Sequence, residues 1–155
     1  MPAGYSTRVE RVIAPAFSWP TRVYWEDTDA GGVVYHAQYL AFLERARSEW
    51  VRAQGYGQER LRQEFELVFA VRAMQIDFLK PARLDDALSV SAELRECRRA
   101  SLVFAQAIHR GEERLFTATV RLAALDPRDF RPRPIPAALY EPLQALVTPA
   151  PQEPT

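Results

Sequence analysis

The chain has 155 residues, with 20 acidic and 20 basic side chains and a pI of about 6.8. This length fits a single domain, and a hydrophobic share of 48% can supply a core of ordinary size. The zero net charge offers no general attraction for nucleic acid or for an anionic membrane surface. No apolar run approaches the ~20 residues of a membrane-spanning helix. We therefore expect one domain that neither binds nucleic acid nor inserts into a membrane.

The content of cysteine and histidine narrows the chemistry further. Cys97 is the only cysteine and there are two histidines, so the sequence predicts no intrachain disulfide and no metal site. No cofactor is expected. Residues 1–11 lack the apolar stretch of a secretory signal, which predicts a cytoplasmic protein. No histidine pattern accompanies Cys97, and no Gly-x-Ser-x-Gly motif is present, which disfavours cysteine and serine hydrolases.

The first elements in chain order are a loose leader over residues 1–17 and a strand over residues 19–26. The strand is predicted because Thr21, Val23 and Trp25 alternate with more polar neighbours. Paired glycines then mark a break before the next element.

A long helix is predicted over residues 37–54. Its apolar side chains recur at spacings of four, three and four, as expected for one face of a helix. They are Tyr39, Leu43, Ala46 and Trp50. Gly55 is suited to a left-handed cap at the end of the helix. Glu44, on the polar side, is expected to pair with Arg47 or Ser48.

The remainder of the chain alternates with period two and predicts four more strands, able to form an antiparallel meander. These strands cover residues 67–78, 88–95, 101–110 and 116–122, with a hairpin turn at Gly111-Glu112-Glu113. Short helices are predicted at residues 58–64 and 137–145, and the chain from Asp126 onward carries eight prolines.

This order predicts an α+β fold, in which one long helix packs on a curved antiparallel sheet of about five strands. The domain is expected to cover residues 18–137, followed by a proline-rich tail over residues 138–155. Such a sheet leaves an edge unpaired, and pairing of edge strands between copies predicts a homo-oligomer.

The segment from Glu26 to Gly32 carries the chemistry. Three carboxylates lie within four positions and are followed by two glycines that lead into the start of the long helix. A helix start offers unpaired N–H groups and a positive dipole end, which can hold an oxygen as negative charge develops on it. A nearby carboxylate can attack a carbonyl carbon or activate water. The alternative is an acidic surface turn.

Residues 23–39, VYWEDTDAGGVVYHAQY, resemble the signature of the hotdog thioesterases of the 4-hydroxybenzoyl-CoA thioesterase superfamily. The resemblance is closer still to the Tol–Pal system-associated acyl-CoA thioesterases. Three further blocks match in order, namely residues 42–50, 80–86 and 101–104. The resemblance covers about residues 18–137.

The resemblance implies a hotdog fold, with a long helix wrapped by the sheet, and an active site at a dimer interface in a homodimer or homotetramer. It implies that Asp29 is the catalytic carboxylate and that the oxyanion donor is the backbone N–H at or near His36, whose side chain also contributes to activity. Asp27 is then a structural partner. Gly32 and Tyr35 would shape the pocket. The phosphates of coenzyme A would lie on arginines, namely Arg98 and Arg99, with Arg83 as a weaker candidate.

The function expected from this resemblance is hydrolysis of acyl-CoA to a carboxylic acid and free coenzyme A. Asp29 would act as a nucleophile or as a general base, and the sequence leaves this open. One alternative is a hotdog hydratase or dehydratase, which needs a histidine opposed by an acid. Another is a module that binds acyl-carrier protein with little activity.

Overall fold

The computed structural model describes residues 17–150, which form an α+β fold with a six-stranded antiparallel sheet. Residues 1–16 and 151–155 lie outside the described residues, and with them nearly all of the predicted leader and the end of the predicted tail. The strands are β1 (Ser18–Arg22), β2 (Val68–Phe78), β3 (Ala87–Ser91), β4 (Glu93–Cys97), β5 (Ser101–Arg110) and β6 (Glu113–Leu125). The helices are the 3₁₀ turn η1 (Trp25–Asp27), α1 (Gln38–Ala53), α2 (Gln58–Phe65) and α3 (Ala137–Ala145).

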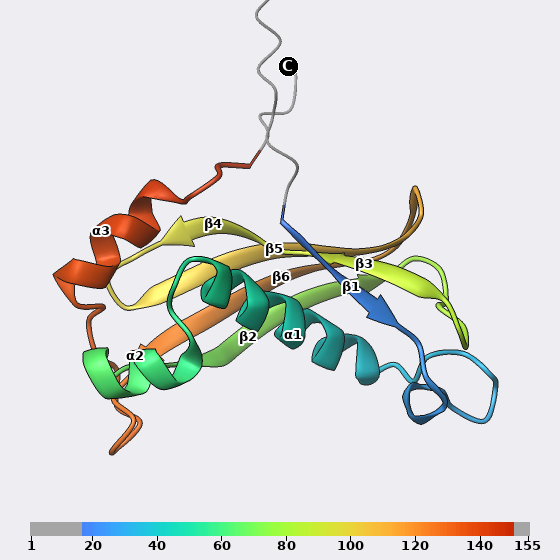
Figure 1. The fold of residues 1–155 in the computed structure, drawn as a ribbon, viewed down its shortest axis with the longest axis horizontal. Helices are drawn as coiled ribbons and strands as arrows, with labels where there is room; N and C mark the ends of the chain where they lie inside the picture. Colours follow the sequence, from blue (N-terminus) through green and yellow to red (C-terminus); the bar gives the residue numbers. More distant parts are fainter. Residues whose placement is uncertain (1–16, 151–155) are drawn as a thin grey trace, which may run out of the picture.

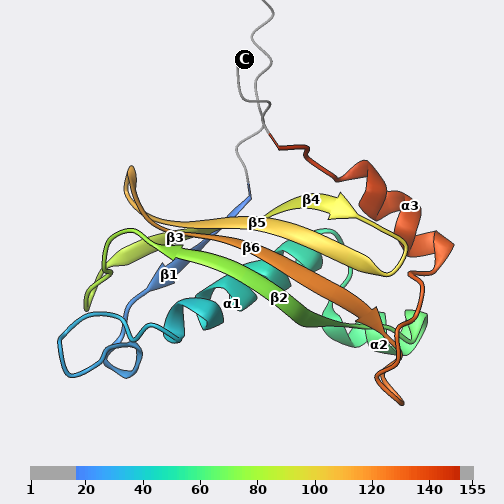
Figure 2. The same ribbon diagram turned by 180° about the vertical axis from the view of Figure 1, so that it is seen from behind.

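The long helix α1 crosses one face of the curved sheet, as Figure 1 shows and as Figure 2 shows from behind. It is one residue shorter at each end than predicted. The predicted apolar stripe is confirmed, because all four of its members are buried against the sheet. Gly55 has a φ of 92° and its N–H donates to the carbonyl of Arg52, so the predicted left-handed cap is also confirmed.

The strand order is β1-β3-β5-β6-β2, with β4 also paired to β5. The predicted meander is therefore wrong for β2 and β3, which follow each other in the chain but lie on opposite sides of the β5–β6 pair. The reason is that β2 pairs along its length with β6, from Val68 opposite Leu125 to Phe78 opposite Phe116. The chain must then pass from one side of the sheet to the other over residues 79–86.

Two predicted strands differ from those in the structure. The strand predicted over residues 88–95 divides at Ala92, whose N–H donates to the carbonyl of Phe17, so the sheet has six strands. The strand predicted over residues 19–26 ends at Arg22, because the chain then turns into η1, where the N–H of Asp27 donates to the carbonyl of Tyr24. Trp25 consequently lies 79% exposed instead of on the inner face with Val23.

The C-terminal helix α3 has the predicted bounds and packs against the sheet through Leu139 and Leu143, which are buried. The hydrophobic core thus extends beyond residue 137, the predicted end of the domain. Among residues 17–150, no helix has the length and apolar character needed to cross a membrane.

Candidate active site

Asp27 organises the loop that joins β1 to α1. Its side chain is 2% exposed and accepts hydrogen bonds from the N–H of Tyr24 (2.9 Å) and from Nε2 of Gln38 (2.8 Å). Its carbonyl oxygen accepts the N–H of Tyr35 at 2.8 Å. One buried residue therefore holds both ends of the loop against the first turn of α1, which is a structural role.

Asp29, two residues later, faces outward. Its Oδ1 accepts the N–H of Gly31 at 2.8 Å, and its backbone bonds to Val33 and Gly32 close the turn. In the part of the chain that the structure describes, no other donor reaches this carboxylate. A Cβ at position 31 would lie 3.2 Å from Oδ1 of Asp29, so a side chain there would displace this carboxylate by a few tenths of an ångström. Gly32 has a φ of 77°, a left-handed conformation that favours glycine.

The start of α1 supplies hydrogen-bond donors beside this loop. The N–H of Gln38 donates to the carbonyl of Tyr35, whereas the N–H groups of His36 and Ala37 have no acceptor among residues 17–150. These two donors coincide with the place predicted for the oxyanion donor. The His36 ring packs against the ring of Tyr35, with centroids 4.5 Å apart.

The loop rests on the connection between β2 and β3. The N–H of Val34 donates to the carbonyl of Ala82 at 2.9 Å, and Val33 forms a β-bridge with Arg83. The N–H of Ala82 in turn donates to Oη of Tyr39 on α1 at 3.0 Å. These contacts tie the loop, the helix start and the connection together by directional bonds.

The three arginines predicted to bind coenzyme A lie in two different places within one protomer. Arg83 lies beside the Asp29 loop through its bridge to Val33. Arg98 and Arg99 lie in the turn between β4 and β5, beside α3 and at the other end of the sheet from the start of α1 (Figure 1). Arg98 pairs there with Glu96 at 3.3 Å.

Glu44 does not form the predicted pair with Arg47, because Arg47 bonds to a different residue in the interior. Arg47 is 7% exposed and donates to Oε1 of Gln106 on β5 at 2.9 Å instead of pairing with Glu44. Burial lowers the pKa of Arg47, and the nearby charge of Glu44 opposes that shift. Arg47 also borders a cavity of about 380 Å³ that opens between α1 and the start of β2.

The sequence did not indicate two features of the site. The first is Trp25, which is 79% exposed and adds a second exposed aromatic residue to the segment that holds Asp29, in addition to Tyr35, which was predicted to shape the pocket and is 46% exposed. The period-two alternation placed Trp25 on the inner face of a strand. Its position next to paired carboxylates could have indicated that it belongs to the site. The second feature, a set of charged side chains around Arg110, joins residues far apart in the chain and has no local pattern.

The arrangement places a carboxylate and N–H donors together, as acyl transfer requires. Among the described residues, no group of three or more histidine, cysteine or acidic side chains could hold a metal ion. Cys97 is buried, and burial raises the pKa of its thiol, which disfavours the thiolate needed for attack. The exposed carboxylate of Asp29 and the N–H donors at the helix start remain as the reactive groups of this loop.

Comparison with known proteins places the chain among thioesterases. Residues 31–117 match the family model of the thioesterase superfamily. The acyl-CoA thioester hydrolase YbgC of Escherichia coli O6:H1 is 47% identical over 79% of this chain and 92% of its own length. The acyl-CoA thioesterase YbgC of Haemophilus influenzae is 46% identical over 77% of this chain and 88% of its own. The crystal structure of a probable thioesterase from Bartonella henselae is 39% identical, covers 77% of this chain and 98% of that one, and has a TM-score of 0.74. The resemblance to the thioesterase superfamily drawn from the sequence, and the hotdog fold it implied, are confirmed.

Proposed function

The chain belongs to the thioesterase superfamily, and from this premise we propose that it hydrolyses acyl-CoA to a carboxylic acid and free coenzyme A, with Asp29 as the catalytic carboxylate. The observation that carries the proposal is the opposite orientation of the two aspartates. Asp27 is buried and fully engaged, whereas Asp29 is exposed and accepts one hydrogen bond, from the loop itself. A carboxylate held in place with an oxygen directed outward can reach a substrate.

The chemistry follows from the two groups that meet at this loop. The N–H groups of His36 and Ala37 donate to the thioester oxygen and stabilise the negative charge that develops on it. In one route Asp29 takes a proton from water, hydroxide adds to the carbonyl carbon, and the C–S bond breaks as the thiolate recovers that proton. In the other route Asp29 attacks the carbon directly, expels the thiolate and forms an anhydride that water then hydrolyses. The His36 side chain would contact the substrate or orient the water.

Coenzyme A enters as part of the substrate, and no other cofactor is proposed. Arg83 is the candidate arginine that adjoins the loop, so it is placed to contact a phosphate. Gly32 shapes the turn and Tyr35 flanks it, which makes both part of the proposed pocket. Arg98 and Arg99 lie at the far end of the same protomer and would contribute from a second copy.

A second copy is expected on the edge strand β2. Within the described residues β2 pairs with β6 on one side only, through ten of its 11 residues, and exposes Val71 and Phe78, with the exposed Leu79 directly after it. Antiparallel pairing of two β2 strands would continue the sheet and cover this apolar edge. It would also bring the cavity beside Val71 of one copy toward the β2–β3 connection of the other, so that the acyl group would bind between subunits. This pairing would give a homodimer, and a homotetramer would need a further contact between two such dimers.

Hydrolysis of a panel of acyl-CoA thioesters, followed by thiol release, tests the proposal. Asp29→Ala should lower kcat by at least about 10³-fold in a protein that remains folded. Asp129→Ala is the matched control, because Asp129 is also exposed and also accepts a hydrogen bond from the N–H two residues later, that of Arg131. The control should keep the activity of the wild type.

The outcomes separate the alternatives. Activity that survives Asp29→Ala removes Asp29 from the mechanism. A wild-type protein that turns over no short, long or aromatic acyl-CoA, but binds acyl-carrier protein, would instead be a carrier-binding module. Hydration of an enoyl-CoA without thiol release would indicate a hydratase.

A further inference from the structure

The connection between β2 and β3, residues 79–86, is the platform on which the Asp29 loop rests. The loop bonds to this connection through Val34 and Val33, as described above. The connection has no regular structure along its length, and Asp85 within it adopts a left-handed φ of 68°. A segment of this kind keeps one conformation only where side chains from other elements hold it.

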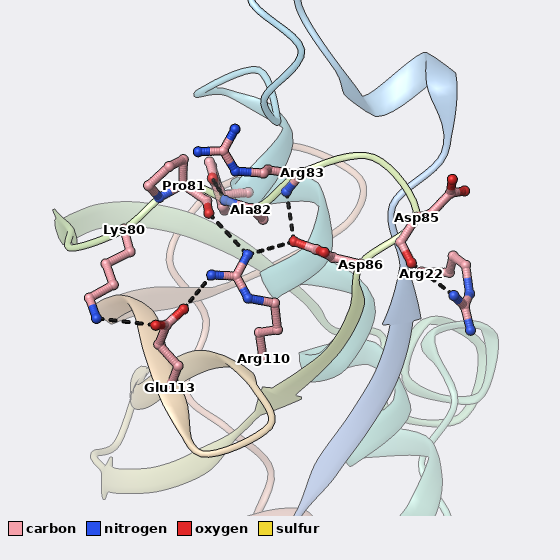
Figure 3. Close-up of polar contacts among 10 residues, drawn as sticks. Arg22, Lys80, Pro81, Ala82, Arg83, Asp85, Asp86, Arg110 and Glu113 are labelled. Atoms are coloured by element: carbon pink, nitrogen blue, oxygen red, sulfur yellow. Dashed lines mark hydrogen bonds and ion pairs between the residues drawn. The ribbon is translucent and has the colours of Figure 1, made fainter.

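Arg110, the last residue of β5, reaches both ends of the connection (Figure 3). Its Nη1 donates to Oδ2 of Asp86 at 2.7 Å and lies 3.3 Å from the carbonyl oxygen of Pro81. The same Oδ2 of Asp86 accepts the N–H of Arg83 at 2.8 Å. One guanidinium therefore bridges the entry and the exit of the turn that carries Ala82 and Arg83.

The β5–β6 hairpin anchors this bridge from the other side. Nη2 of Arg110 pairs with Glu113, and Glu113 also pairs with Lys80 at 3.1 Å. The planar fork of arginine presents Nη1 and Nη2 to different acceptors in a fixed geometry, whereas a lysine ammonium offers its three donors from a single nitrogen. Burial raises the pKa of Asp86, but the N–H of Arg83 and the guanidinium of Arg110 outweigh it and hold the pKa below its usual range, so this carboxylate is charged at neutral pH.

We propose that Arg110 is a positioning residue for the reaction. By bonding to Pro81 and Asp86 it fixes the backbone of Ala82 and Arg83. This backbone in turn holds the Asp29 loop in its reactive geometry. Arg110 acts through the connection, whose Ala82 and Arg83 contact the loop. The proposal rests on the proposed function of Asp29. A loop that moves by about 1 Å loses the alignment between nucleophile and carbonyl, an effect that can reach 10²-fold in rate.

The test compares Arg110→Gln and Arg110→Lys with Arg95→Gln. Arg95 is a matched control, because it also pairs with a carboxylate, Glu93 at 2.6 Å, and donates to two backbone carbonyls, of Thr148 and Pro149, away from the Asp29 loop. Steady-state kinetics on the preferred acyl-CoA and amide hydrogen exchange of residues 24–36 are measured for each folded variant.

In Arg110→Gln we expect kcat to fall about tenfold with a change in KM below about threefold, and amide exchange in residues 24–36 to accelerate. Arg110→Lys should show smaller changes of the same kind, and it replaces the glutamine variant if that variant does not fold. Arg95→Gln should change neither quantity.

Unchanged exchange in the Arg110 variants, or equal changes in the Arg95 control, would overturn the proposal. Faster exchange with an unchanged kcat would also overturn it, since the loop would then move without consequence for the reaction. The exchange measurement does not depend on catalysis. A failure of the proposed function would appear separately, as activity that survives Asp29→Ala.

Discussion

Replacement of Tyr39 by phenylalanine removes one hydroxyl group that joins α1 to the platform of the active-site loop. Oη of Tyr39 accepts the N–H of Ala82 at 3.0 Å, and both residues are buried. The aromatic ring would be retained, including its stacking on Phe116, with centroids 5.0 Å apart. The substitution therefore isolates the hydrogen bond from the packing.

The loss of stability expected in Tyr39→Phe follows from the burial of Ala82, which is 0% exposed. Its N–H has no other acceptor among the described residues, so it would be left unsatisfied, at a cost of about 1–3 kcal/mol. For a chain of this size about 1 kcal/mol shifts Tm by roughly 2–4 °C, so Tm should fall by about 2–12 °C. Thermal unfolding by circular dichroism at a fixed protein concentration measures the shift.

Tyr56→Phe serves as the control. The Tyr56 ring packs on Phe65 and lies under the Arg60 guanidinium, and its hydroxyl has no hydrogen-bond partner among residues 17–150. Tm should change by less than about 2 °C in this variant. A Tm for Tyr39→Phe that equals the wild-type value would refute the reasoning, because a buried N–H would then have lost its acceptor without cost.

Two further predictions concern titration. The carboxylates of Asp86 and Glu113 have pKa values below their usual range, Asp86 against the opposing effect of burial and Glu113 through the side chains of Arg110 and Lys80. Their contribution to stability is thus present above about pH 4–5 and is lost as the pH falls through the lower folded-state values. Tm measured from pH 6 to pH 3 should therefore fall less steeply in Asp86→Asn than in the wild type, and parallel curves would contradict the assignment. Cys97 is 7% exposed, and burial raises the pKa of its thiol. A disulfide reagent at pH 8 should therefore label this thiol only when the protein unfolds. Rapid labelling of the native protein would disprove its burial.

Much of the local structure could be predicted because it depends on the periodicity of neighbouring residues. The stripe on α1, the glycine cap at Gly55, the hairpin at Gly111 and the bounds of α3 were all predicted, and each reflects contacts within a few residues. The loop that carries Asp29 could be recognised for the same reason, since its carboxylates, its glycines and the helix start adjoin one another in the chain.

The errors have a common cause in contacts between distant residues. The predicted strand containing Trp25 ends early where the chain turns into η1, whose Asp27 accepts a hydrogen bond from Gln38 on α1, and the break at Ala92 coincides with a bond to Phe17. No alternation of residue types along either segment announces these bonds. The orientation of Asp27 likewise depends on Gln38, which a separate element brings into place.

By itself, the amino-acid sequence determined which segments are helical or extended, where the reactive loop lies and which family the chain resembles. These properties depend on residue type and short-range spacing, which the chain carries directly. Only the tertiary structure decided the strand order, the exposure of Trp25 and the clasp of Arg110 on Pro81 and Asp86. Such features arise when residues far apart in the chain compete for the same hydrogen-bond partners and the same buried space, and the lowest free energy of the whole fold selects among them.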